Sequence, residues 1–201
     1  MYAQITDGAI AATGTLKQLF PNTSFPAGVA DSTFKTENGL QGIVNAERKD
    51  EKYYYVNQGD VTLVGGVATQ GFTNTAMAIE DVDAKDSDGN QLYVQVLDPD
   101  FDNGEGRPAG KMVDTSEKMI TRGLKYSFKN QIKEQANSAL TQTDWMVIRL
   151  AEREVAIPDA TVTYRAAVIT EYGRLKTAIT GAADIDALAV VMGAQNWPEQ
   201  V

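Results

Sequence analysis

The chain has 201 residues but no cysteine and no histidine. The absence of cysteine excludes disulfide bonds, thiol nucleophiles and thiolate metal sites. The absence of histidine removes the commonest general base and the commonest transition-metal ligand, and it excludes a Ser-His-Asp triad. Pairs of carboxylates remain as a catalytic device, but the sequence singles out no pair. We therefore predict a non-enzymatic protein without a cofactor or a transition-metal site.

Long apolar runs and an N-terminal targeting signal are also missing. Hydrophobic residues make up 43% of the chain, yet no run approaches the roughly 20 apolar residues that a membrane span needs. The first residues lack the basic start and apolar core of a secretory signal. The chain is long enough for one sizeable core or two small domains, and we expect no membrane partner.

Positive charge is scarce in the first half of the chain. The net charge is -9, and residues 1–106 carry 6 basic against 16 acidic side chains, whereas residues 107–201 carry 12 against 11. Nine acidic residues lie within residues 80–105, where Lys85 is the only basic residue. A protein that binds a nucleic-acid duplex needs a dominant basic surface, so we expect no nucleic-acid partner.

Short stretches of alternating apolar and polar residues, separated by turn residues, fill the first half. Residues 2–12 have the pattern of a hairpin that turns at Asp7-Gly8. Residues 71–82 and 91–97 have the pattern of a second hairpin, joined by a connection rich in Asp, Ser, Gly and Asn. The even spacing of such strands predicts a small antiparallel β domain.

Helical periodicity dominates the second half. Asp114 with Glu117 forms a capping-box pattern, which predicts a long helix over residues 115–140. Apolar side chains recur on this stretch every four residues and form one stripe, made of Ile120, Leu124, Phe128, Ile132, Ala136 and Leu140. This face needs another helix to cover it.

Helix start and stop signals also occur in the last third of the chain. Thr141 and Asp144 fit the [ST]-x-x-[DE] pattern of a helix start. Pro158 fits the first turn of another helix, because the N–H that proline lacks is unbonded there in any case. Gly181 is expected to end that helix, and Asp184 to begin a last short one.

These patterns together predict an α+β fold. The first domain, residues 1–106, is expected to be small, antiparallel and β-rich. The second domain, residues 107–201, is expected to be an α-helical hairpin or bundle. The boundary lies in residues 103–110, where three glycines and one proline favour a hinge.

The acidic residues of the second predicted hairpin suggest a test for calcium binding. An EF-hand loop needs oxygen ligands at fixed positions around a glycine. Around Gly89, two of the four ligand positions that we tested lack a suitable side chain. An irregular calcium site built from Asp81, Asp83, Asp86 and Asp88 is an alternative, but the default expectation is a solvated, turn-forming loop.

Basic residues recur at helical spacing on the predicted long helix. They are Lys118, Arg122, Lys125, Lys129 and Lys133. Such a stripe can contact nucleic acid or another anionic surface, and we keep the last four as interface candidates. The favoured alternatives are structural: a solvated face, or ion pairs with the acid-rich residues 80–105 of the same chain or of a neighbouring copy.

Several residues of the last third stand in a recognisable order. They are Asn137 and Leu140; Thr143, Asp144 and Trp145; Tyr164 and Arg165; and Trp197 and Pro198. In this order and spacing, over about 65 residues, the segment resembles the C-terminal region of small tailed-phage proteins, the tail fibre assembly proteins or tail assembly chaperones and their relatives. Residues 1–26 are similar, over a shorter and less specific stretch, to the start of small phage tail-cluster proteins.

The resemblance implies a protein that works by docking within a phage tail. Our leading hypothesis is a structural component of the virion tail, at the tail fibre, baseplate or fibre attachment, made in the host cytoplasm. The alternatives are a transient tail fibre assembly chaperone and a carboxylate-dependent enzyme acting on host surface glycans. The chain lacks the long polar linker usual in assembly proteins, which favours a resident component. The expected partners are other tail or fibre proteins, with the chain itself in a homo-oligomer or symmetric assembly.

Four residues of the resembling segment are the leading interface candidates: Trp145, Tyr164, Arg165 and Trp197. Tryptophan, tyrosine and arginine are enriched where interfaces bury most of their energy. The alternative is that Trp145 and Tyr164 simply close the core between two helices. We favour the core position for Trp145 and leave both readings open for Trp197.

Overall fold

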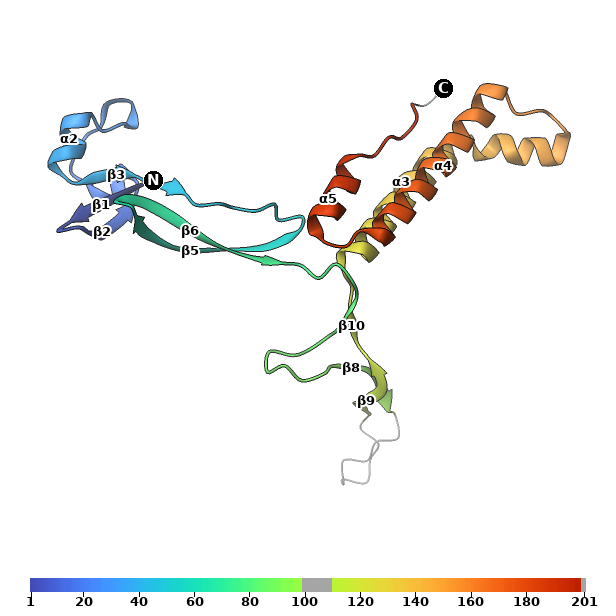
Figure 1. The fold of residues 1–201 in the computed structure, drawn as a ribbon, viewed down its shortest axis with the longest axis horizontal. Helices are drawn as coiled ribbons and strands as arrows, with labels where there is room; N and C mark the ends of the chain where they lie inside the picture. The colour runs from blue at the N-terminus through green and yellow to red at the C-terminus, as the bar shows by residue number, and fades with distance from the viewer. Residues whose placement is uncertain (99–109, 200–201) are drawn as a thin grey trace. The chain divides into compact units, whose positions relative to one another are not determined.

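The computed structural model describes residues 1–98 and 110–199, and it has an antiparallel β-rich part followed by helices (Figure 1). The predicted α+β class is therefore confirmed. The chain divides into two compact units, Met1–Met77 and Ala78–Val201, which we call the N-terminal unit and the helical unit. The predicted domain boundary between Gly106 and Arg107 lies outside the described residues, and the two units divide earlier in the chain.

A small antiparallel sheet begins the N-terminal unit. Its strand order is β2-β1-β3, with β1 at Tyr2–Thr6, β2 at Ala9–Gly14 and β3 at Leu40–Gly42. Thr6 pairs with Ala9 across a two-residue turn in which Asp7 and Gly8 both have positive φ. This geometry matches the twist of the flanking strands, so the predicted first hairpin is confirmed.

Short helical segments and aromatic rings cover this sheet. They are α1 at Leu16–Leu19, the 3-10 turn η1 at Pro26–Gly28 and α2 at Ser32–Glu37. Leu16 and Leu40 are buried in a cluster that includes Tyr2 and three phenylalanines. Phe20, Phe25 and Phe34 meet edge to face, with ring centroids 5.1 to 6.4 Å apart.

A long hairpin completes the N-terminal unit. Strand β5 at Tyr54–Val64 pairs with β6 at Val67–Ala76, and the short β4 at Val44–Asn45 adds to the other edge of β6. The predicted hairpin between residues 71–82 and 91–97 is wrong. Gly65 and Gly66, both with positive φ, form a tight two-residue turn that pairs β6 with the strand before it.

The helical unit begins with a narrow β ribbon. Strand β8 at Tyr93–Asp98 pairs with β9 at Lys111–Lys118, and β7 at Val82–Asp83 pairs with β10 at Ile120–Thr121. The predicted helix start at Thr115 is therefore wrong, because residues 111–118 are the partner strand of β8. The local capping signals at Asp114 and Glu117 are overridden by this long-range pairing.

Three helices follow: α3 at Leu124–Arg153, α4 at Asp159–Gly181 and α5 at Ile185–Gly193. Their largest fully buried side chains are Ile132, Val168, Leu175, Ile179 and Leu188. The predicted boundaries at Pro158, Gly181 and Asp184 are confirmed, and the Asp184 carboxylate accepts the N–H of Ala187 at 2.8 Å.

The predicted helix start at Thr141 and Asp144 is wrong, because both residues lie inside α3. Thr141 Oγ1 bonds back to the Asn137 carbonyl at 2.8 Å, one turn earlier, as in a continuous helix. Asp144 instead forms an ion pair with a residue of α4. The capping pattern at Thr141 and Asp144 lies within the long apolar periodicity of α3. It therefore does not start a new helix.

Candidate functional site

Arg165 joins α4 to the middle of α3. Its Nη1 lies 2.9 Å from the Asp144 carboxylate and donates to Thr143 Oγ1 at 2.6 Å and to the Leu140 carbonyl at 2.9 Å. One residue earlier, the Tyr164 hydroxyl donates to the Ala139 carbonyl at 3.4 Å. We call these contacts the Arg165 clamp. Charged groups that share several hydrogen bonds in a half-buried site fix the relative positions of the two helices.

Tyr164 belongs to the core of the same helix pair. It is buried with Ala136 and Val168, and Trp197 packs against this cluster from the C-terminal segment. A hollow of about 480 Å³ lies beside the two aromatic rings and is otherwise lined by α3 side chains, mostly polar. The structure therefore brings Tyr164, Arg165 and Trp197 into one region of the helical unit.

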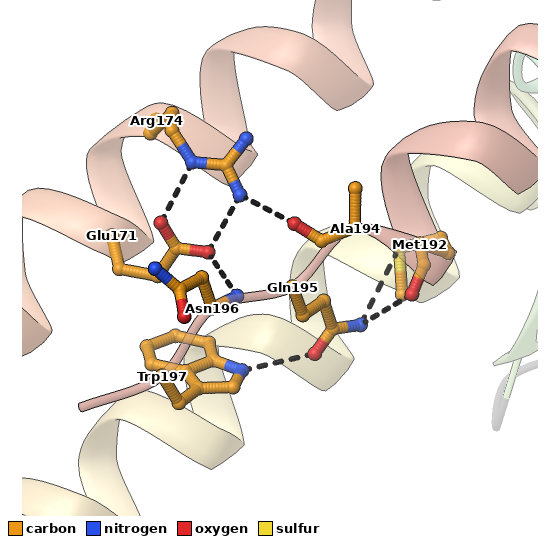
Figure 2. A network of polar contacts seen from close by, with 7 residues as sticks. All are labelled: Glu171, Arg174, Met192, Ala194, Gln195, Asn196 and Trp197. Atoms are coloured by element: carbon orange, nitrogen blue, oxygen red, sulfur yellow. Dashed lines mark hydrogen bonds and ion pairs between the residues drawn. The ribbon is translucent and has the colours of Figure 1, made fainter. Parts of the chain in front are cut away.

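A polar network holds the segment that carries Trp197 (Figure 2). The Glu171 carboxylate accepts two hydrogen bonds from Arg174, at 2.6 and 2.7 Å, and one from the Asn196 N–H at 2.7 Å. Arg174 also donates to the Ala194 carbonyl at 2.8 Å. The Trp197 indole N–H donates to Gln195 Oε1 at 2.9 Å. These bonds tie residues 194–197 across α4.

The same network shifts the acidity of its members. The Arg174 guanidinium lowers the pKa of Glu171, and the Asn196 N–H lowers it further, although burial opposes both. Glu171 correspondingly raises the pKa of Arg174. Sequence reasoning missed this pair. The spacing of three residues between opposite charges on a helix was the available signal, but nothing in the sequence locates Asn196 beside them.

Trp145 lies on the outside of α3, so the prediction that it closes the core between two helices is wrong. Its side chain is 51% exposed, and the Arg149 guanidinium lies 4.9 Å from its ring centroid. Thr143 is the buried residue on this turn. Side chains two positions apart on a helix point in nearly opposite directions, so Trp145 faces away from α4.

Trp145 belongs to a segment with little cover, residues 144–153, which we call the α3 arm. In Figure 1 the last turns of α3 project away from α4. Val147 and Leu150 are 40% and 41% exposed, and Ile148 is 57% exposed. Beyond the arm, Val155 and Val162 are also exposed. Exposed apolar side chains therefore occur along the arm, in the connection that follows it and near the start of α4.

The candidate basic stripe is mostly engaged by acidic residues of the same chain. Arg122 pairs with Asp81 at 2.6 Å, and Lys125, which is buried, pairs with Glu80 and donates to the Thr180 carbonyl. Outside the candidate set, Lys118 pairs with Asp83. The predicted ion pairs with the acid-rich region are confirmed for these three residues. On the next turns of α3, Lys129 is half-buried and Lys133 is exposed.

The acidic partners also hold the start of α3. Asp81 accepts the Gly123 N–H at 2.9 Å, and the N–H groups of Leu124 and Lys125 donate to the carbonyls of Ala78 and Ile79. These bonds satisfy helix N–H groups that have no partner within the helix. The Gly123 N–H and then Arg122 lower the pKa of Asp81. The sequence could suggest the charge pairing but not the backbone contact.

The acidic loop folds as a turn. The Asp86 carboxylate accepts the N–H groups of Asp88 and Asn90 and the Asn90 side-chain amide, at 2.8 to 3.0 Å. Asp81 and Asp83 are occupied by Arg122 and Lys118. Across residues 1–98 and 110–199, no three acidic side chains gather as a metal-binding group. The loop therefore forms a turn, which was the default expectation from the sequence.

The candidate residues thus fall into two groups. Tyr164, Arg165, Arg122 and Lys125 are held in internal contacts, whereas Trp145 presents its ring outward within the exposed α3 arm.

None of the described helices has the length and apolarity needed to cross a membrane. In comparisons with known proteins, no family model, no curated protein and no solved structure matches this chain.

Proposed function

We propose that this chain is a structural component of a bacteriophage tail, and that it acts by docking to other proteins rather than by catalysis. The proposal starts from the resemblance of residues 137–198 to phage tail assembly proteins and their relatives. Its partners are other tail or fibre proteins, and its place is the tail of the virion after synthesis in the host cytoplasm.

The observation that carries the proposal is the exposed α3 arm. Large apolar side chains are normally buried, and several of them exposed together mark a site of interaction. Here Trp145 and Ile148 lie on one side of the arm and Val147 and Leu150 on the other, and all are at least 40% exposed. Apolar surface stabilises an association by roughly 25 cal/mol for each Å² removed from water. Such an arm is therefore suited to a protein partner.

The Arg165 clamp supports the same function. It attaches the base of the arm to α4 through Leu140, Thr143 and Asp144. A surface that is already held in its bound conformation loses less conformational entropy on binding. The clamp residues are part of the resembling segment, so the segment supplies both the rigid base and the outward tryptophan.

The proposal is tested on virions of the phage that encodes this chain. Mass spectrometry of purified particles should detect the chain at a fixed ratio to the major tail proteins, and electron microscopy should assign it density on the tail. A chain that is absent from mature particles but bound to soluble fibre protein in infected cells would instead be an assembly chaperone, and this version of the function would be wrong.

A further inference from the structure

We infer that residues 194–197 form a strap that opens and closes across α4 while the three helices stay folded. The strap follows the end of α5 at Gly193 and has no regular secondary structure. Its latch is the pair Glu171 and Arg174, and the group that it releases is Trp197. Such a strap acts in the same way wherever the chain resides, so it is independent of the proposed place in a phage tail.

Both hydrogen bonds drawn between the strap and α4 in Figure 2 depend on one ion pair. Glu171 Oε1 accepts the Asn196 N–H at 2.7 Å, and Arg174 Nη2 donates to the Ala194 carbonyl at 2.8 Å. The same two atoms of Glu171 and Arg174 bond each other at 2.6 Å. Because each atom serves both the ion pair and the strap, a change at either residue weakens both attachments.

The Trp197 ring lies where it can leave the helices without displacing them. Its one N–H donor bonds within the strap, to Gln195 at 2.9 Å. The ring packs against the cluster of Ala136, Tyr164 and Val168. The hollow of about 480 Å³ borders the same ring, so α3 does not close over it on that side.

The helices that carry the strap are held more firmly than the strap itself. Val168 and Leu175 of α4 and Leu188 of α5 are fully buried, whereas Asn196 is exposed and Trp197 is half-buried. Segments with few buried contacts open at a lower free energy than the core around them. Opening uncovers the apolar cluster that the Trp197 ring covers, so the strap controls access to the contact between α3 and α4.

Native-state hydrogen exchange followed by NMR tests the opening on the wild-type chain. The Asn196 N–H should exchange through a local opening whose rate does not change in low urea, because little surface is exposed. The Val168 N–H, in the middle of α4, should exchange only through unfolding and should therefore accelerate steeply with urea. If the two N–H groups share one free energy of exchange and one urea dependence, the strap is part of the cooperative fold and the inference is wrong.

Substitution of the latch tests which residues hold the strap. Glu171→Gln should speed the exchange of the Asn196 N–H and of the Trp197 indole N–H by the same factor, about tenfold or more, because a hydrogen bond to a charged acceptor is lost. Glu134→Gln, beside the Trp197 ring but outside the network, is the matched control and should leave both rates unchanged.

Rates that stay at the wild-type values in Glu171→Gln, or that rise for Asn196 alone, would overturn the inference. Circular dichroism should show the wild-type helical content in both variants. If Glu171→Gln does not fold, the wild-type exchange experiment still decides whether the strap opens by itself. None of these measurements concerns virion content, so the proposed function stands or falls separately.

Discussion

Arg165 Nη1 on α4 lies 2.9 Å from Asp144 Oδ1 on α3, although the two residues are separated by the whole turn between the helices. The side chain of Arg165 is only 19% exposed, whereas that of Asp144 is 51% exposed. Arg165 also bonds Thr143 and the Leu140 carbonyl. The arginine is therefore the centre of the contact, and Asp144 is the outermost of its three partners.

Replacing Arg165 should loosen the helix hairpin. Arg165→Ala removes the interhelical hydrogen bonds and leaves Thr143 and the Leu140 carbonyl with fewer partners, so we expect a loss of about 1 to 3 kcal/mol in the free energy of unfolding. Urea unfolding followed by circular dichroism measures this loss. Asp144→Ala should cost less, about 1 kcal/mol or below, because its carboxylate is half exposed. Equal losses for the two variants would contradict the central position of Arg165.

The start of α3 should not tolerate a side chain at position 123. A Cβ on Gly123 would lie 2.4 Å from the carbonyl carbon and oxygen of Glu80, which are backbone atoms that cannot rotate away. Gly123→Ala should therefore destabilise the helical unit by about 1 to 3 kcal/mol, as measured by thermal unfolding. Gly173→Ala is the matched control. Its Cβ meets nothing within 4 Å in the middle of α4, so it should stabilise the helix by up to about 1 kcal/mol.

The free energy of unfolding should fall at acidic pH, because two carboxylates have lowered pKa values in the folded chain. Hydrogen bonds from Arg174 and the Asn196 N–H lower the pKa of Glu171 below 4.5, and hydrogen bonds from the Gly123 N–H and Arg122 lower the pKa of Asp81 below 3.8. A carboxylate with a lowered folded-state pKa stabilises the fold fully above its unfolded value. This contribution is lost as the pH falls through the folded-state pKa.

Unfolding experiments between pH 7 and pH 2 measure this dependence. The wild type should hold its stability down to about pH 5 and then lose it steadily, since both carboxylates begin to take up protons in the unfolded chain. Glu171→Gln combined with Asp81→Asn should be less stable at pH 7 and should show a flatter decline. A decline as steep as that of the wild type would assign the acid sensitivity to other groups.

Trp145 should contribute little to the stability of the single chain. Because its ring is half exposed, Trp145→Ala should cost no more than about 1 kcal/mol in unfolding experiments at low protein concentration. Phe128→Ala, at a buried position of the same helix, should cost about 3 to 5 kcal/mol. A loss of that size at Trp145 would place its ring in the core, as the sequence-based interpretation favoured.

Sequence patterns predicted the buried face of the first half of α3 and the boundaries of the helices that follow it. Leu124, Phe128, Ile132 and Ala136 face the core as the four-residue stripe indicates, and Pro158 stands at the start of α4. These signals act within a turn or two of the chain. What they cannot supply is which side of α3 a second helix covers beyond Ala136, and that uncertainty led to the wrong placement of Trp145.

Long-range pairing accounts for the other differences. Asp114 and Glu117 carry a valid local signal for a helix, yet β9 pairs with β8 across residues that lie 25 positions apart at Tyr93 and Lys118. The ion pairs between the acid-rich and basic stretches were predicted correctly, because opposite charges attract each other in any backbone conformation. The close backbone contact at Gly123, in contrast, depends on where the chain enters α3, which no local pattern encodes.

The contacts at the start of α3 give the β ribbon the properties of an insertion. Asp81 and Gly123, 42 positions apart, are hydrogen-bonded to each other, so the excursion between them begins and ends at one point. The entropic cost of closing such an excursion rises only by about 0.6 kcal/mol for each doubling of its length. The length of this excursion can therefore change at a small entropic cost, provided that the closing contact at Gly123 is kept.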